Sequence, residues 1–139
     1  MFANMPEIEG ASDALWRLSD AGVWVRIVTH RLVVKKTHQQ AVADTVAWLE
    51  KPRADGRPRI PYRDICFIGT KREVGGDMYI DDAPHNVAAL RGAGYDTIVM
   101  DAAYNQEVPA PRAKSWADIE RLVLAKMAWK NADPMNQAS

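Results

Sequence analysis

The sequence contains little cysteine, little histidine and no long hydrophobic run. The single cysteine, Cys66, has no second cysteine with which to form an internal disulfide. This is typical of proteins in a reducing compartment, and it leads us to expect a cytoplasmic location. No apolar stretch approaches the ~20 residues that a helix needs to cross a bilayer, so we expect no membrane association. Three histidines and one cysteine also offer few nitrogen and sulfur ligands for zinc.

The chain also lacks an excess of charge of one sign. Its 18 basic and 18 acidic side chains balance to a formal net charge of zero, so nothing indicates a surface for nucleic acid. Four arginines gather in the proline-rich loop 52–63, where they either attract a phosphate-bearing ligand or, as is more common, form a solvated surface. From the length of 139 residues we expect one domain over residues 1–130 and a flexible tail over 131–139.

Apolar spacing indicates that helices and strands alternate. It predicts helices over residues 11–21, 39–51 and 115–130, and a further helix that begins at Pro84. Runs of β-branched and apolar residues predict strands over 23–28, 64–68, 77–80 and 96–100, whereas no regular structure is expected over 102–114. The run 23–28 has the composition of a central strand. This order predicts an α/β fold with a Rossmann-like parallel sheet and flanking helices.

Two adjacent carboxylates, Asp81 and Asp82, follow the third predicted strand and come directly before the helix at Pro84. They therefore lie at the carboxyl end of a parallel strand, which is where ligands bind in open α/β sheets. Neighbouring carboxylates repel each other, and Mg²⁺ prefers oxygen ligands, so the pair predicts a magnesium site. An alternative of about equal weight is that Asp82 only caps the helix and Asp81 is solvated.

Two other predicted strands are followed by groups that suit phosphate. Thr29 ends the first strand, and Lys71 comes shortly after the second. Because the carboxyl ends of parallel strands share one edge, we expect these groups to lie near the two aspartates and to bind phosphate oxygens. His30 either contacts a substrate or is only a polar residue at the strand end. Such a set suits phosphoryl chemistry assisted by Mg²⁺.

The order and spacing of these motifs resemble those of a known family. The segments Ile27-Val28-Thr29, Gly69-Thr70-Lys71 and Tyr79-Ile80-Asp81-Asp82 resemble motifs two, three and four of the haloacid dehalogenase (HAD-like) superfamily. The match looks closest to the 5'(3')-deoxyribonucleotidase-like branch. Two later segments, Tyr104-Asn105 and Arg112…Ser115-Trp116, also resemble segments of that branch.

This resemblance implies a Rossmann-like phosphohydrolase that hydrolyses a nucleoside monophosphate or another small phosphate ester with Mg²⁺. It implies catalytic roles for Thr29 and Lys71, metal binding by Asp81 and Asp82, and substrate contacts by Thr29, His30 and Lys71. In the family a first Asp attacks phosphorus and forms an aspartyl-phosphate, and a second Asp two residues later is the general acid and base.

The Asp-x-Asp motif that supplies those two residues is absent, because none follows any apolar strand of this chain. In the family its strand lies between the strands that end here at Thr29 and Asp81. Its loss leaves a gap, or two edges that must pair with each other or with another chain. Three interpretations stay open, in this order. The chain is a shortened nucleotidase that is inactive by itself, or it is a degenerate relative that binds metal or phosphate or serves as an interaction module, which can be oligomeric. In the third interpretation, a second polypeptide or a swapped segment completes the chain.

Overall fold

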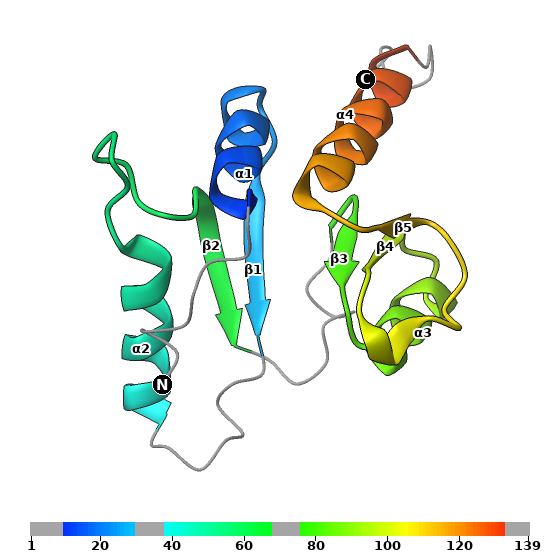
Figure 1. Ribbon diagram of the computed structural model, residues 1–139, viewed down its shortest axis with the longest axis horizontal. Helices are drawn as coiled ribbons and strands as arrows, with labels where there is room; N and C mark the ends of the chain where they lie inside the picture. Colours follow the sequence, from blue (N-terminus) through cyan, green and yellow to red (C-terminus); the bar gives the residue numbers. More distant parts are fainter. Residues whose placement is uncertain (1–9, 30–37, 68–75, 133–139) are drawn as a thin grey trace. The chain divides into compact units, whose positions relative to one another are not determined.

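Helices and parallel strands alternate along the chain, so the predicted α/β fold class is confirmed. The computed structural model describes residues 10–29, 38–67 and 76–132, and the chain divides into two compact units, Met1–Gly75 and Gly76–Ser139 (Figure 1). The first unit contains α1 (Ala11–Asp20), β1 (Val25–Thr29), α2 (His38–Glu50) and β2 (Tyr62–Phe67). The second contains β3 (Tyr79–Asp81), α3 (Pro84–Gly92), β4 (Thr97–Met100), the 3-10 turn η4 (Ala103–Asn105), β5 (Arg112–Ala113) and α4 (Trp116–Ala132).

In the first unit β1 and β2 run side by side in the same direction, with Ile27 opposite Ile65 (Figure 1). Among the described residues, β2 is the only strand that pairs with β1. The apolar residues of β1 are only half-buried, although their composition is that of a central strand. One edge of an apolar strand is therefore left without a neighbour in this part of the structure.

The arginine loop between α2 and β2 is folded onto α1. Arg53 donates a hydrogen bond from Nη1 to Ser12 Oγ at 2.8 Å, and its Nη2 lies 2.8 Å from Asp13 Oδ1. Trp16 Nε1 donates to the backbone oxygen of Pro58 at 2.8 Å, which fixes the loop a turn further along the helix. These contacts favour a structural role for this loop over phosphate capture.

The remaining arginines of the loop stack on indole rings. The Arg57 guanidinium lies 4.7 Å from the ring centroid of Trp16 on α1, and that of Arg59 lies 4.4 Å from the ring centroid of Trp48 on α2. Stacking of this kind stabilises by about 0.5–2 kcal/mol at sites that range from exposed to desolvated. Trp48 and the buried Arg59 therefore help to hold the loop against α2.

We expect Arg53→Ala to lower the free energy of unfolding by about 1 kcal/mol, because it removes hydrogen bonds to Ser12 and Asp13. Urea titrations followed by tryptophan fluorescence measure the change. The matched control is Lys51→Ala, which removes an exposed cation two residues away and should change stability by less than about 0.5 kcal/mol. Equal effects of the two substitutions would contradict the docking of the loop.

The second unit is a parallel three-stranded sheet in the order β3-β4-β5, with Ile80 opposite Ile98 and Val99 opposite Arg112. Its core is formed by Ile98, Ala113 and Ile119, and the half-buried side chains of Ile80 on β3 and Leu122 on α4 pack against it. Among the described residues β4 is the only strand that pairs with β3. Each unit thus has a parallel sheet that ends, on one side, in an apolar strand.

The segment 102–114 is more regular than its sequence predicts. It forms η4 and then β5, which pairs with β4 through backbone hydrogen bonds such as Asp101 N to Ala113 O at 2.8 Å. A strand of two residues is too short to produce an alternating pattern, and the prolines at 109 and 111 point to a loop.

No described helix is both long enough and apolar enough to cross a membrane.

Candidate functional site

Asp81 and Asp82 lie where β3 ends and α3 begins. Pro84 takes the first turn of α3, where its missing N–H needs no partner, and Ala83 just before it has extended backbone. The local sequence therefore turns the chain sharply at the carboxyl end of the sheet. The predicted location of the aspartate pair agrees with this geometry, and their role in binding metal stays a prediction.

The two carboxylates differ in their surroundings. Asp81 is only 7% exposed; its Oδ1 accepts the backbone N–H of Ala83 at 3.0 Å, and its Oδ2 accepts from Asn86 Nδ2 at 3.3 Å. Asp82 is exposed. The alternative in which Asp82 caps the helix and Asp81 is solvated is therefore wrong, because Asp81 is the buried residue and the one that accepts hydrogen bonds at the start of α3. The buried Asp81 accepts the hydrogen bonds of the turn, because it is the last residue of the strand and points into the unit.

A buried asparagine holds the two strand ends together. Asn105, which is 2% exposed, donates from Nδ2 to the backbone oxygens of Asp82 and Met100, both at 2.8 Å. Its Oδ1 accepts from the backbone N–H of Ala102 at 3.0 Å and from Arg112 Nη1 at 2.9 Å. The carboxamide therefore has partners on both sides, as a buried amide requires.

Arg112, on β5, fixes the same turn from the other side. Its Nη2 donates to the backbone oxygens of Asn105 at 2.7 Å and Val108 at 3.0 Å, and its Nη1 lies 2.7 Å from Asp101 Oδ1. A hydrogen bond from Gln106, followed by the hydrogen bond and charge of Arg112, lowers the pKa of Asp101 below its usual value. Asp101 is thus committed to this network as an anion.

Tyr104 contacts the exposed aspartate. Its hydroxyl donates to Asp82 Oδ2, although the tyrosine itself is 62% exposed. This hydrogen bond, then partial burial, then the negative charges of Asp82 and Asp81 raise the pKa of Tyr104 above its ordinary value. The phenol therefore stays protonated at neutral pH and remains a hydrogen-bond donor.

The carboxyl edge of the second unit suits Mg²⁺ better than zinc. The described residues contain no group of three or more His, Cys, Asp and Glu side chains placed to hold a metal. Mg²⁺ keeps several water ligands and is commonly held by one or two carboxylates together with substrate phosphates, so an exposed aspartate beside a second one fits it. Zinc needs three or four protein ligands, usually of nitrogen or sulfur.

The other predicted site residues belong to the first unit. Thr29 is the last residue of β1, as predicted, and its backbone is paired in register with Phe67. His30 and Lys71 lie outside the described residues. The structure thus places the aspartates at the carboxyl end of one parallel sheet and Thr29 at the carboxyl end of another.

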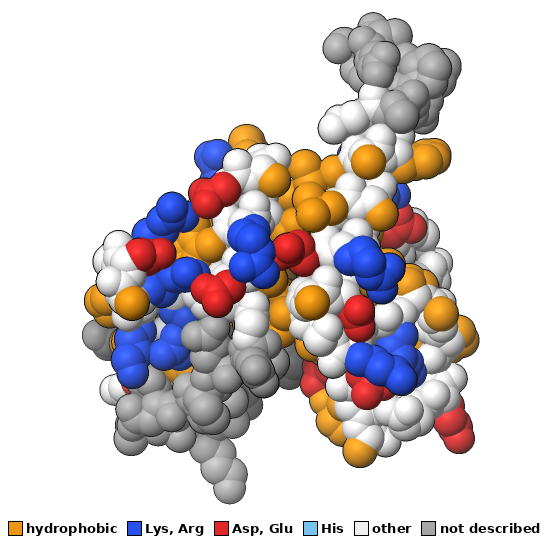
Figure 2. Space-filling model, turned by 45° about the horizontal axis from the view of Figure 1, so that its top comes forward, with side chains coloured by type: hydrophobic (Ala, Val, Ile, Leu, Met, Phe, Trp, Pro, Cys, Tyr) orange, Lys and Arg blue, Asp and Glu red, His pale blue; other side chains and the backbone are white. Residues whose placement is uncertain are grey.

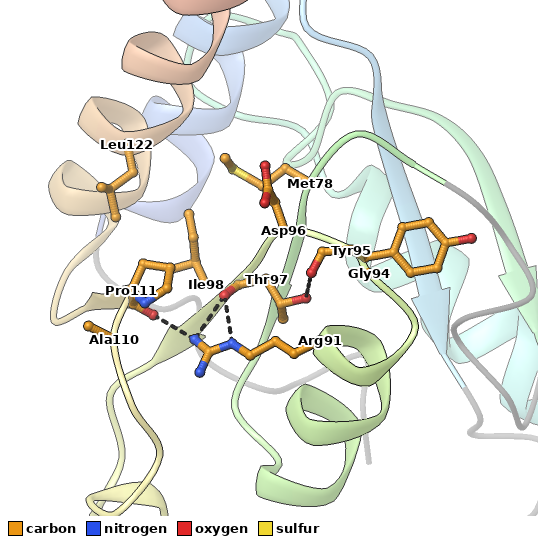
Figure 3. Close-up of a pocket in the computed structure, with 10 residues that line it drawn as sticks. All are labelled: Met78, Arg91, Gly94, Tyr95, Asp96, Thr97, Ile98, Ala110, Pro111 and Leu122. Carbon is orange, nitrogen blue, oxygen red and sulfur yellow. Dashed lines mark hydrogen bonds between the residues drawn. The ribbon is translucent and has the colours of Figure 1, made fainter.

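Among the described residues of the second unit, two hollows are of interest. The one in Figure 3, of about 480 Å³, lies at the amino end of β4 beside Asp96, on the opposite edge from the aspartate pair. There Arg91 donates to the backbone oxygens of Thr97 and Pro111 (Figure 3). The other, of about 650 Å³, lies between α3 and the loop from Ala103 to Pro109 and includes Tyr104. Only the second adjoins the candidate site.

Side chains of both charges are exposed on the same face of the protein (Figure 2). On the face drawn in Figure 2, Lys and Arg side chains lie among Asp and Glu side chains and hydrophobic groups. Trp24 lies in the predicted strand 23–28 and is nevertheless 73% exposed, with the Arg63 guanidinium 4.3 Å from its ring centroid.

Comparison with known proteins identifies a family and a curated relative to which the chain is similar. The model of a family described as "5' nucleotidase, deoxy (Pyrimidine), cytosolic type C protein" matches residues 1–128. A curated protein of Chlorobaculum tepidum, named "Putative 5'(3')-deoxyribonucleotidase", is 42% identical over 125 residues, which cover 90% of this chain and 59% of that protein. The chain therefore spans less than two thirds of the length of this relative.

Proposed function

Since the chain belongs to the HAD-like family of deoxy (pyrimidine) 5' nucleotidases of cytosolic type C, we propose that it forms the phosphate-binding part of a Mg²⁺-dependent phosphatase that acts on nucleoside monophosphates. The observation that carries the proposal is the Asp81–Asp82 pair at the carboxyl end of β3, held by Asn105, in a chain that matches the family over residues 1–128. A cytoplasmic location is part of the same proposal and is supported by the single cysteine.

Within this proposal each site residue has a separate task. Asp82, with Asp81 beside it, would hold Mg²⁺, whose charge offsets the negative charge that builds up on the phosphoryl group. Thr29 and Lys71 would bind phosphate oxygens through a hydroxyl and an ammonium group, and His30 would contact the substrate. Asp81, which already accepts two hydrogen bonds, would mainly fix the turn that presents Asp82.

We propose that this chain is inactive by itself, because it has no Asp-x-Asp motif after an apolar strand to supply the nucleophile and the general acid. The apolar strands β1 and β3 each pair on one side among the described residues, which supports the need for an additional strand. An added strand that carries this motif would complete the single domain expected over residues 1–130.

A second candidate is a module without catalysis that binds metal or phosphate, or that associates with other chains. The observation that favours it is the pair of incompletely flanked strands, since an open parallel edge is a template for association. Phosphate release after addition of a segment that carries the Asp-x-Asp motif discriminates between the two candidates.

The first experiment measures phosphate release from a panel of deoxynucleoside monophosphates with Mg²⁺. For this chain alone we expect release no faster than that of the Asp81→Ala/Asp82→Ala double variant. The variant Asp82→Asn, which keeps the shape of an exposed side chain, serves as a control that preserves the fold. If the unmodified chain releases phosphate, and both the double variant and Asp82→Asn abolish this release, then a nucleophile is present. That result would overturn the proposal that the chain is inactive alone.

A further inference from the structure

The turn that follows β4 is built to place one hydroxyl group. The two donors of Asn105 are bonded to the ends of β3 and β4, and its acceptor is bonded to Ala102 and Arg112. Because Asn105 is the neighbour of Tyr104 in η4, fixing the asparagine fixes the backbone from which the tyrosine extends. The position of Tyr104 therefore does not depend on burial of its ring.

The hydroxyl of Tyr104 reaches a single oxygen of the exposed aspartate. It donates to Oδ2 of Asp82, while Asn105 holds the backbone oxygen of the same residue. In the part of the chain that the structure describes, Oδ1 of Asp82 has no hydrogen-bond donor. An exposed carboxylate rotates freely unless something holds it, so this contact selects one orientation. One oxygen is engaged and the other is left for a ligand.

We propose that Tyr104 is a positioning residue, set in place by Asn105, whose hydroxyl holds Asp82 Oδ2 so that Oδ1 remains available to a divalent cation. This inference rests on the proposed function, because it assumes that Asp82 is a metal ligand. Preorganisation of this kind is usual around metal sites, where groups that do not touch the metal orient its ligands. Tyr104 would act on the cation only through Asp82.

The test is a Mn²⁺ titration of the full chain, followed by paramagnetic broadening of backbone amide signals in NMR spectra. We expect broadening centred on Asp81–Ala83, and a dissociation constant about three- to ten-fold weaker for Tyr104→Phe than for the wild type, which is the scale of one ordinary net hydrogen bond at a solvent-exposed site. The matched control is Tyr95→Phe. The ring centroid of Tyr95 lies 5.1 Å from that of Tyr79. This substitution also removes one phenolic oxygen, but at a position away from Asp81 and Asp82.

A second readout separates positioning from a merely structural role. With 3-fluorotyrosine in place of the four tyrosines, the ¹⁹F signal that disappears in Tyr104→Phe should shift during a Mg²⁺ titration, whereas the signal lost in Tyr95→Phe should not. The melting temperature of Tyr104→Phe should stay close to that of the wild type, because the ring is exposed.

The outcomes distinguish this inference from the proposed function. Broadening at Asp81–Ala83 with equal affinities of wild type and Tyr104→Phe would overturn the positioning role and leave the metal site standing. Absence of broadening there in the wild type would overturn both. A loss of affinity in Tyr104→Phe, with Tyr95→Phe unchanged, supports both.

Discussion

Phosphate release should rise by about 10³-fold or more when a family segment that carries an Asp-x-Asp strand is joined to this chain or added to it. Removal of a covalent nucleophile from an enzyme can lower kcat by as much as about 10⁶-fold, so this is a conservative expectation. The expected gain is large because Mg²⁺ and phosphate-binding groups stabilise charge but cannot form the aspartyl-phosphate. Release of inorganic phosphate from deoxynucleoside monophosphates, measured with and without the segment, gives the ratio.

The control for this result is the same segment with both aspartates changed to asparagine, which should associate equally well and give no turnover. The edges of β1 and β3 that have no partner strand among the described residues are the sites at which a parallel strand could pair. If the aspartate-bearing segment binds and turnover stays at the level of this control, the enzyme proposal fails and the non-catalytic module is favoured.

Ile119→Ala should destabilise the second unit by about 3 kcal/mol, within the range for removal of three buried carbons from a well-packed core. Ile119 lies on α4, is fully buried, and contacts the cluster of Ile98 and Ala113. Because the chain divides into two units, the measurement should report on the second unit alone. Hydrogen exchange of the Ile98 and Val99 amides in β4 does so.

The matched control is Leu124→Ala on the same helix, where the side chain is 42% exposed. It should cost less than about 1 kcal/mol, since little apolar area leaves water at this position. If the two substitutions accelerate exchange equally, then α4 does not pack on the sheet through Ile119, and the assignment of this core is wrong.

Much of the fold could be predicted because hydrophobic spacing specifies local structure. The apolar face of residues 11–21 and the stop near Gly22 produce α1, and Ser115 accepts the Asp118 N–H at 3.2 Å at the start of α4. The carboxylate of Asp118 accepts the N–H of Lys114, and this bond lowers the pKa of Asp118. β5 could not be predicted, because two residues are too few to show an alternating pattern and the strand is defined by its pairing with β4.

The candidate site was predictable in position but not in detail. The chemistry of adjacent carboxylates after an apolar strand identifies Asp81 and Asp82, yet their difference in burial depends on which side of the turn faces the sheet. Asn105 and Arg112 lie near one another only because β5 returns beside β4, so no spacing in the sequence reveals their network. The local signal in the sequence was the resemblance of Tyr104-Asn105 and Arg112…Ser115-Trp116 to the nucleotidase branch, which marks these residues without showing their contacts.

The incompletely flanked strands also affect how the protein should be handled. Natural edges are commonly protected by charged side chains, and the one charged residue of β1, Arg26, is paired with Asp64 on β2 at 2.6 Å. Another copy of the chain would then compete with any completing strand for the same backbone groups, and self-association rises with concentration. Dilute preparations should therefore accept a completing segment more readily than concentrated ones, and slow aggregation on storage would be a direct physical result of this architecture.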